Sequence, residues 1–255
     1  GYGSAYIEAI KKSKGRYIII GDADDTYDFL EIPKFLEPLM KKEADFVIGD
    51  RFSGGIQKEA MPLLHRYIGN PFLTKTLNLF FNSNISDAHC GLRGFTREAW
   101  EELDLKTMGM EFASEMIIKS VQKDLTIKEI PVKLYKRNGS RPKINSFSDG
   151  WRHLRFMMLH APNYLFMVPG IFIISLGIFL MGSLVTGPIS LWGVNLDIHP
   201  MILGSLLTLF GFQILLYFII VKEYGVYNGL IDESKTTQFV KSHFTLERGL
   251  ILGGV

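Results

Sequence analysis

The sequence is poor in cysteine and in net charge. Cys90 is the only cysteine among 255 residues, which excludes a framework of internal disulfides and fits a reducing, cytoplasmic setting for the water-exposed part. The net charge is only +2, so the basic excess typical of nucleic-acid-binding proteins is missing and no nucleic-acid partner is expected. Internal repeats and low-complexity tracts are absent as well.

Charged residues are missing from one long segment, because no Asp, Glu, Lys or Arg occurs between Arg155 and Asp197. Two weakly polar or apolar stretches, Tyr164 to Val185 and Met201 to Val221, are each long enough to cross about 30 Å of hydrocarbon as a helix. The alternative is a buried core helix of a water-soluble protein, but two such stretches in tandem argue against it. Their position in the chain excludes a signal peptide. The sequence therefore predicts an integral membrane protein with a helical hairpin.

The flanks of these stretches predict the orientation. The connection from Thr186 to Pro200 contains no Lys or Arg, whereas Lys222 follows the second stretch and several basic residues precede the first. The positive-inside rule then places both ends of the hairpin, and the preceding domain, on the cytoplasmic side. Tyr164 and Trp192 stand where interfacial aromatic residues are expected. The preceding basic residues are Lys136, Arg137, Arg141, Lys143, Arg152 and Arg155.

Short apolar strands alternate with helical segments over the first part of the chain. This alternation predicts an α/β domain with a mostly parallel sheet, whose ligands bind at the C-terminal tips of the strands. Gly15 is expected as the C-cap of the first helix and Thr96 as an N-cap. Strands are expected at 17–20, 45–49 and 127–135, and helices at 5–14, 31–42, 66–81, 96–103 and 110–123.

The expected domains follow from these patterns. Residues 1–149 form the α/β domain, 150–162 an interfacial amphipathic helix, 163–222 two transmembrane helices, and 223–255 a cytoplasmic tail or the start of a further membrane segment.

An acidic cluster follows the first strand directly. Asp22 and Asp24 are spaced i, i+2 after the run Tyr17 to Ile20, so both carboxylates can turn toward one ligand at the strand tip. Carboxylate oxygens suit a hard divalent cation, Mg²⁺ or Mn²⁺, which also binds diphosphates. The alternative for an isolated pair of this kind is a solvated acidic turn.

Several arginines are candidates for binding phosphate beside this acid pair. Arg51, Arg66 and Arg93 occupy loops or helix starts, and arginine matches phosphate bidentately while staying charged. A surface salt bridge is the alternative for any one of them. The basic loop from Arg137 to Lys143 is suited to closing on an anionic ligand, and it serves equally as a positive-inside flank.

The order of these motifs resembles a known family. G-Y-G-S-A, D-A-D-D-T-Y-D, G-D-R-F, D-x-x-C-G-x-R and R-x-G-S-x-x-K are followed by a membrane hairpin. This order is similar to that of the polyprenyl-phosphate sugar synthases, the group of dolichyl-phosphate mannose synthase. They are family 2 glycosyltransferases of the GT-A fold. The resemblance covers about the first 160 residues.

The resemblance implies a reaction and a set of site residues. The reaction is inverting transfer of a sugar from a nucleotide-sugar to a polyprenyl phosphate, dolichyl or undecaprenyl, at the cytoplasmic face of the lipid bilayer. The nucleophile is already an anion, so positioning and charge stabilisation suffice. The implied roles are metal binding by Asp22 and Asp24; catalysis by Arg51, Arg66 and Asp87; binding of the acceptor phosphate by Arg51, Arg66 and Asn70; and binding of the donor diphosphate by Gly3, Ser4, Arg137, Ser140 and Lys143.

The chain also departs from the family pattern. The P-x-Y-N-E strand that reads the nucleotide is missing, which predicts that the chain as given is incomplete. Two alternatives stay open. One is a processive polysaccharide synthase of the same fold, although no Q-x-x-R-W motif is present. The other is a non-catalytic membrane module derived from it.

The residues themselves also suggest roles for Asp87, Glu115, His89 and Cys90. Either Asp87 or Glu115 shapes the acceptor side, His89 is structural, and Cys90 is a small buried residue.

Overall fold

The computed structural model describes most of the chain and divides it into two compact units, Gly1–Met157 and Met158–Val255. The predictions for Ser140, Lys143 and Trp192 concern residues outside the described part, and so does most of the predicted tail at 223–255. The described residues are 1–137, 146–185, 187–191, 194–227, 233, 238–239 and 242–243.

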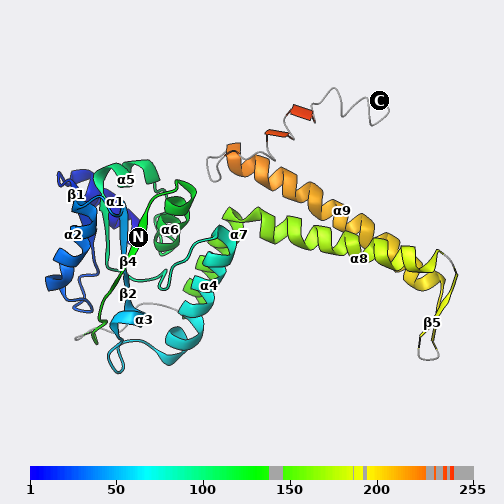
Figure 1. Ribbon diagram of the computed structural model, residues 1–255, viewed down its shortest axis with the longest axis horizontal. Coiled ribbons are helices and arrows are strands. Elements are labelled where there is room, and N and C mark those ends of the chain that lie inside the picture. The colour runs from blue at the N-terminus through cyan, green and yellow to red at the C-terminus, as the bar shows by residue number, and fades with distance from the viewer. Residues whose placement is uncertain are drawn as a thin grey trace. The chain divides into compact units, whose positions relative to one another are not determined.

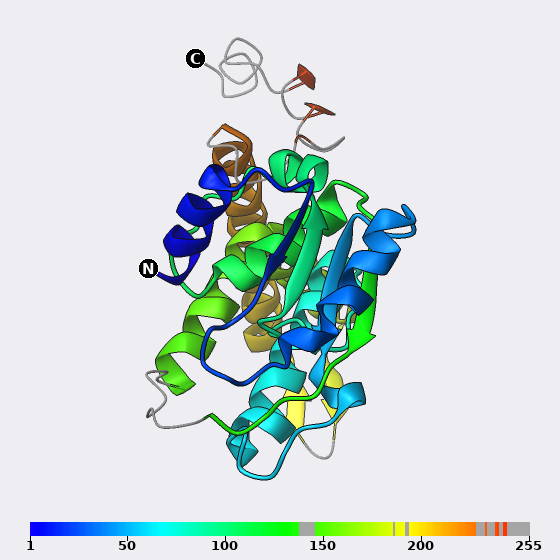
Figure 2. The same cartoon turned by 90° about the vertical axis from the view of Figure 1, so that its left-hand side faces the viewer.

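A four-stranded mixed sheet forms the centre of the first unit. The strand order is β1-β3-β2-β4, and β3 runs antiparallel to both of its neighbours while β2 and β4 are parallel. Figure 2 shows these strands side by side. The predicted α/β class is confirmed: three strands share one direction, and β3 opposes them. The strands are β1 Tyr17–Ile20, β2 Phe46–Asp50, β3 Arg93–Thr96 and β4 Ile127–Pro131.

Helices connect these strands. Thr96 caps α5 as expected, because its hydroxyl accepts a hydrogen bond from the Ala99 N–H at 3.1 Å. The expectation for Gly15 is wrong: the first helix ends at Lys12, and its C-cap is Ser13, whose N–H donates to the Ala9 and Ile10 carbonyls. The helices are α1 Tyr2–Lys12, η1 Phe29–Glu31, α2 Ile32–Met40, α3 Arg51–Gly54, η2 His65–Gly69, α4 Asn70–Phe81, α5 Arg97–Leu103, α6 Phe112–Gln122 and α7 Ser146–His160.

The hydrophobic core lies between the sheet and helix α2, which packs against all four strands. Every residue of β2 is buried, and Phe46, Val47 and Ile48 expose no surface at all. Phe35 and Leu39 of α2 join the same core. Complete burial of β2 fixes the sheet, so the residues just beyond β1 and β2 are held on a rigid base.

The second unit contains the two predicted apolar helices, which lie side by side in Figure 1. The segments Asn163–Leu184 and Ile198–Tyr227 are long and apolar enough to cross a membrane, with only 11% and 17% of their most apolar windows buried. Such low burial does not fit the core helices of a water-soluble protein. The second helix continues beyond the apolar stretch that ends at Val221, and Lys222 lies inside it.

Close backbone approach holds these two helices together. A Cβ atom on Gly177 would lie 2.5 Å from the Gly204 carbonyl oxygen, and a Cβ atom on Gly204 would lie 2.8 Å from the Gly177 carbonyl oxygen. Small residues of this kind are common where membrane helices pack. The unit comprises η3 Asn163–Met167, α8 Val168–Leu184, the antiparallel pair β5 Ile189–Leu191 and β6 Val194–Leu196, and α9 Ile198–Tyr227.

Candidate functional site

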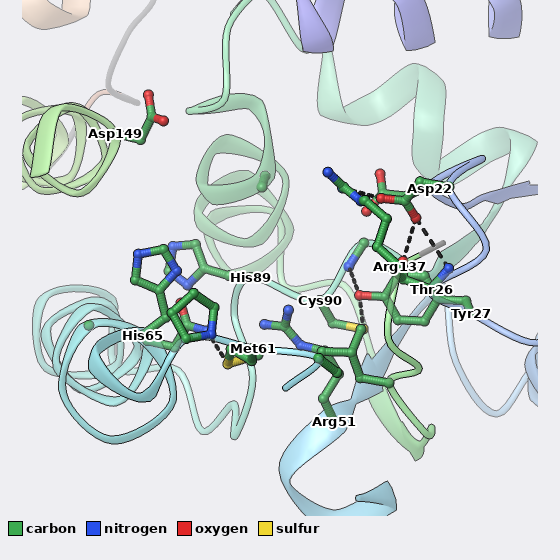
Figure 3. A pocket seen from close by; sticks show the side chains of 18 of the residues that line it. Asp22, Thr26, Tyr27, Arg51, Met61, His65, His89, Cys90, Arg137 and Asp149 are labelled. Atoms are coloured by element: carbon green, nitrogen blue, oxygen red, sulfur yellow. Dashed lines mark hydrogen bonds and ion pairs between the residues drawn. The ribbon is translucent and has the colours of Figure 1, made fainter. Parts of the chain in front are cut away.

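A pocket of about 900 Å³ lies within the first unit, beyond the ends of β1 and β2. Figure 3 shows Asp22, Thr26, Tyr27 and Arg137 grouped on one side of it. The predicted residues that line it are Asp22, Asp24, Arg51, Asn70 and Arg137. The structure therefore brings the acid pair together with one predicted catalytic residue and with residues predicted to bind each substrate.

Two tyrosines of α1 hold Asp22. The hydroxyls of Tyr2 and Tyr6 each donate to its Oδ1 atom at 3.3 Å. Burial raises the pKa of Asp22, and the nearby charge of Asp24 raises it further. A cation beside the pair would relieve both effects.

Asp24 is held from the other side of the acid pair. Its Oδ1 accepts hydrogen bonds from the Thr26 hydroxyl at 2.5 Å and from the Thr26 N–H at 3.3 Å. Its Oδ2 pairs with the Arg137 guanidinium. Burial by itself raises the pKa of Asp24, but the bonds from Thr26 and Arg137 outweigh it and hold the pKa below its ordinary value. Asp24 is therefore ionised at neutral pH.

Glycine at position 91 leaves the space that Asp22 occupies. A Cβ atom there would lie 2.2 Å from Asp22 Oδ2, which is closer than any contact allows. Gly91→Ala is therefore expected to displace the Asp22 carboxylate and to weaken Mn²⁺ binding about tenfold, the loss of one ligand contact. Titration with Mn²⁺ followed by electron paramagnetic resonance measures this change. Gly150→Ala is the control, since its Cβ would meet nothing within 4 Å, and equal Mn²⁺ affinity in both variants would contradict the account.

A buried ion pair fixes Arg51. Its Nε and Nη2 atoms donate to the two carboxylate oxygens of Asp87 at 2.6 and 2.7 Å, and its backbone N–H donates to Oδ2 at 3.1 Å. Burial by itself lowers the pKa of Arg51, but the Asp87 carboxylate outweighs it and raises the pKa well above the ordinary value. Asp87 does not line the pocket. In this geometry it orients Arg51, which does.

Other predicted residues are not among those that line the pocket. A Cβ on Gly3 would lie 2.4 Å from the Thr107 carbonyl oxygen, so glycine here permits helix packing. The Ser4 hydroxyl donates to the Gly1 carbonyl at 2.8 Å. The Arg66 guanidinium lies over the ring of the adjacent tyrosine, 5.5 Å from its centroid. These residues have local structural contacts rather than a place in the pocket wall.

Two more candidates from the sequence have structural roles. Arg93 is buried and donates to the carbonyls of Ala88 and Ala113 at 2.8 and 2.7 Å, so it joins β3 to α6, and it does not line the pocket. Glu115 accepts hydrogen bonds from Lys106 and Thr107 and thereby anchors the segment before α6.

Cys90 is buried, as expected, and its thiol lies 3.7 Å from the Tyr27 hydroxyl. Burial raises its pKa to about 11. At pH 8 only about one thiol in a thousand is then ionised, and the thiolate is the reactive form. Native protein is therefore expected to resist iodoacetamide at pH 8 while denatured protein reacts within minutes. Mass spectrometry measures the difference, and rapid alkylation of the folded chain would contradict this environment.

Several pocket residues were not foreseen. Tyr2 lines the pocket, and Tyr6, outside the pocket wall, shares its hydrogen bond to Asp22. The two tyrosines are spaced i, i+4 on a helix, so their common face was a usable signal. Met61 and His65 lie in one segment, whereas His89 and His153 come from distant parts of the sequence, so these pocket residues meet only through the fold.

The acid pair suits a divalent cation. Among the described residues no group of three or more His, Cys, Asp or Glu side chains forms a cage for a metal ion. The carboxylates of Asp22 and Asp24 nevertheless supply hard oxygen ligands, and a cation would relieve the repulsion between their charges. Mg²⁺ commonly binds through one or two carboxylates plus substrate phosphates. The residues present therefore fit a metal that arrives with a diphosphate.

The fold and the pocket define a class: an α/β domain with an acid pair at a strand tip, followed by two apolar helices long enough to span a membrane. The family model described as "Glycosyl transferase family 2" matches residues 1–104. This part of the chain is therefore similar to the glycosyl transferase family 2 domains, in agreement with the resemblance seen in the motifs.

Curated relatives agree with this assignment. The whole chain is 45% identical over 257 residues to "Low-salt glycan biosynthesis hexosyltransferase Agl6" of Haloferax volcanii, and spans 61% of that protein's length. A "Dolichyl-phosphate hexose transferase" of the same organism is 29% identical over 150 residues, covering 59% of this chain and 63% of the relative. "Glycosyltransferase AglJ", also from Haloferax volcanii, is 30% identical over 152 residues, covering 59% of this chain and 49% of the relative.

Proposed function

We propose that the full-length protein transfers a hexose from a nucleotide-sugar to a polyprenyl phosphate. An oxygen of the lipid phosphate attacks the anomeric carbon, the bond from that carbon to the β-phosphate oxygen breaks, and the nucleoside diphosphate leaves. The observation that carries this proposal is the pocket in which the acid pair and the buried cation Arg51 meet. The names of two relatives, a hexosyltransferase and a dolichyl-phosphate hexose transferase, support it.

The donor diphosphate binds beside Asp22 and Asp24, and these residues hold the Mg²⁺ or Mn²⁺ that offsets its charge. Arg137 already pairs with Asp24, so it is within reach of the same diphosphate. Departure of the nucleoside diphosphate then needs no proton from the protein.

The acceptor phosphate binds near Arg51. The ion pair with Asp87 holds the guanidinium of Arg51 in one orientation. A cation positioned in advance reduces the unfavourable free energy of bringing the acceptor phosphate close to the donor diphosphate. Asn70 lines the same pocket, where its amide contacts the Met61 sulfur at 3.4 Å.

An exposed apolar surface borders the pocket on the side of η2 and α4. Leu63 and His65 line the pocket, while Leu63 itself is 72% exposed. Exposed apolar residues gathered in one segment mark a contact surface for a membrane or a lipid chain. Its members are Leu63, Leu64, Tyr67, Ile68 and Phe72. Together with the basic flank of the apolar helices, it supports a reaction at the cytoplasmic membrane surface.

A transfer assay tests this function. Membranes containing the full-length protein are incubated with polyprenyl phosphate, Mg²⁺ and each of a panel of radiolabelled UDP- and GDP-hexoses. We expect one hexose to enter the lipid extract as a product labile to mild acid. No lipid product from any donor, with the protein folded and inserted, would contradict the proposal.

A further inference from the structure

His89 lines the pocket but has no part in the proposed transfer. Both of its ring nitrogens are shielded from solvent, and neither has a hydrogen-bond partner among the described residues. Buried polar groups are nearly always paired, so an unpaired imidazole in a pocket wall needs an explanation.

The neighbours of His89 fix where its ring lies. Its backbone N–H donates to Asp87 Oδ1 at 3.3 Å. The His153 ring packs edge-on against it, with centroids 4.7 Å apart and planes at 90°. His153 is itself held by the Ser114 hydroxyl, 2.8 Å from its Nδ1. The hydrogen bond to Asp87 thus positions the His89 backbone, and His153 packs against the ring. Rotation about the χ2 angle of His89 can still turn a ring nitrogen toward a ligand.

The charge state of His89 favours a hydroxyl as its partner. Burial lowers the pKa of His89 well below its ordinary value, and His153, Arg51 and Arg93 lower it further. A neutral imidazole offers one donor and one acceptor. A sugar hydroxyl also both donates and accepts, whereas a phosphate only accepts and is better matched by arginine.

The position of His89 relative to the acid pair agrees with a sugar. Gly91 lies directly against the Asp22 carboxylate, as the 2.2 Å clash of its built Cβ indicates. His89 is two residues earlier, and two residues of chain span at most about 7 Å. A sugar carried by a diphosphate at the acid pair is therefore within reach of His89. In Figure 3, His89 is grouped with His65 and Met61, across the pocket from Asp22 and Arg137.

We propose that His89 binds a hydroxyl of the transferred hexose and so selects the sugar, with His153 holding the His89 ring in place. This inference rests on the proposed function, since it assumes that the diphosphate at the acid pair carries a hexose. It makes His89 a specificity-determining residue.

The test separates binding of the sugar from binding of the nucleotide. Affinities of the full-length protein with Mg²⁺ are measured by calorimetry for the nucleotide-hexose that the wild type uses and for the matching nucleoside diphosphate. His89→Phe is expected to weaken the nucleotide-hexose about tenfold, the loss of one hydrogen bond, and to leave the nucleoside diphosphate within about twofold. His89→Gln keeps a donor and an acceptor and is expected to restore most of the loss. His199→Phe, exposed at the start of α9, is the control.

Deoxy analogues of the donor keep the test decisive if a variant folds poorly. For the wild type, removing one particular hydroxyl is expected to cost about tenfold in affinity, and His89→Phe is expected to be insensitive to that removal. Equal losses for both ligands, no loss in His89→Phe, or no sensitive hydroxyl would overturn the proposal while transfer by the wild type continued. A wild type that neither binds nor transfers any hexose would refute the proposed function, and this inference with it.

Discussion

Asp24→Asn is expected to slow hexose transfer about a thousandfold, because a lost metal ligand removes several kcal/mol of charge stabilisation from the departing diphosphate. Asp24 is ionised at neutral pH, since Thr26 and Arg137 hold its pKa below its ordinary value. Asparagine keeps the size of the side chain and removes its charge, so the effect reports on the charge. The rate is measured under saturating donor with the transfer assay.

Asp25→Asn is the matched control for this prediction. Asp25 is the next residue, and it is exposed with a φ of 66°, a left-handed conformation that asparagine tolerates well. We expect this variant to transfer hexose at nearly the wild-type rate. Equal activity of Asp24→Asn and the wild type would show that the acid pair does not hold the catalytic metal.

Asp87→Ala is expected to lower the free energy of unfolding by about 3–5 kcal/mol, because it leaves the Arg51 cation buried without its partner. The Asp87 side chain is completely buried and the Arg51 side chain is only 10% exposed. Urea unfolding of the full-length protein in detergent, followed by tryptophan fluorescence, measures the loss.

Two further variants distinguish the effect of a buried unpaired charge from the effect of losing an ion pair. Arg51→Met combined with Asp87→Ala is expected to be less destabilised than Asp87→Ala alone, since no unpaired charge is buried. Glu37→Ala breaks the exposed pair with Lys41 and is expected to leave the unfolding midpoint almost unchanged. If Asp87→Ala were as stable as Glu37→Ala, the buried pair would not hold Arg51 as described.

Local sequence was enough to predict the strands that run through the core. β1 and β2 are short apolar runs that must be buried, and both lie within one residue of their predicted places. β3 was not predicted because Arg93 and Gly94 interrupt its apolar character. The carbonyls that satisfy the buried Arg93 come from Ala88, Cys90 and Ala113, and only the folded chain brings them together.

The same division applies to the pocket. Asp22, Asp24 and Arg51 stand at strand tips, where an α/β fold gathers ligands, so position along the chain predicted them. Partners set the roles of other residues. Asp87 was predicted as catalytic, yet its bond to Arg51 spans 36 residues and places it behind the pocket wall. His89 was expected to be structural because a phosphate nucleophile needs no base. Nothing in the sequence indicated that its ring would pack against His153 with neither nitrogen hydrogen-bonded among the described residues.

The most direct measurement of the central claim uses a donor labelled in two places, with ¹⁴C in the hexose and ³²P in the β-phosphate. Attack on the anomeric carbon predicts that ¹⁴C enters the polyprenyl product while all ³²P leaves with the nucleoside diphosphate, and that EDTA stops both. Entry of ³²P into the lipid together with ¹⁴C would mean transfer of a sugar phosphate, and would contradict the account.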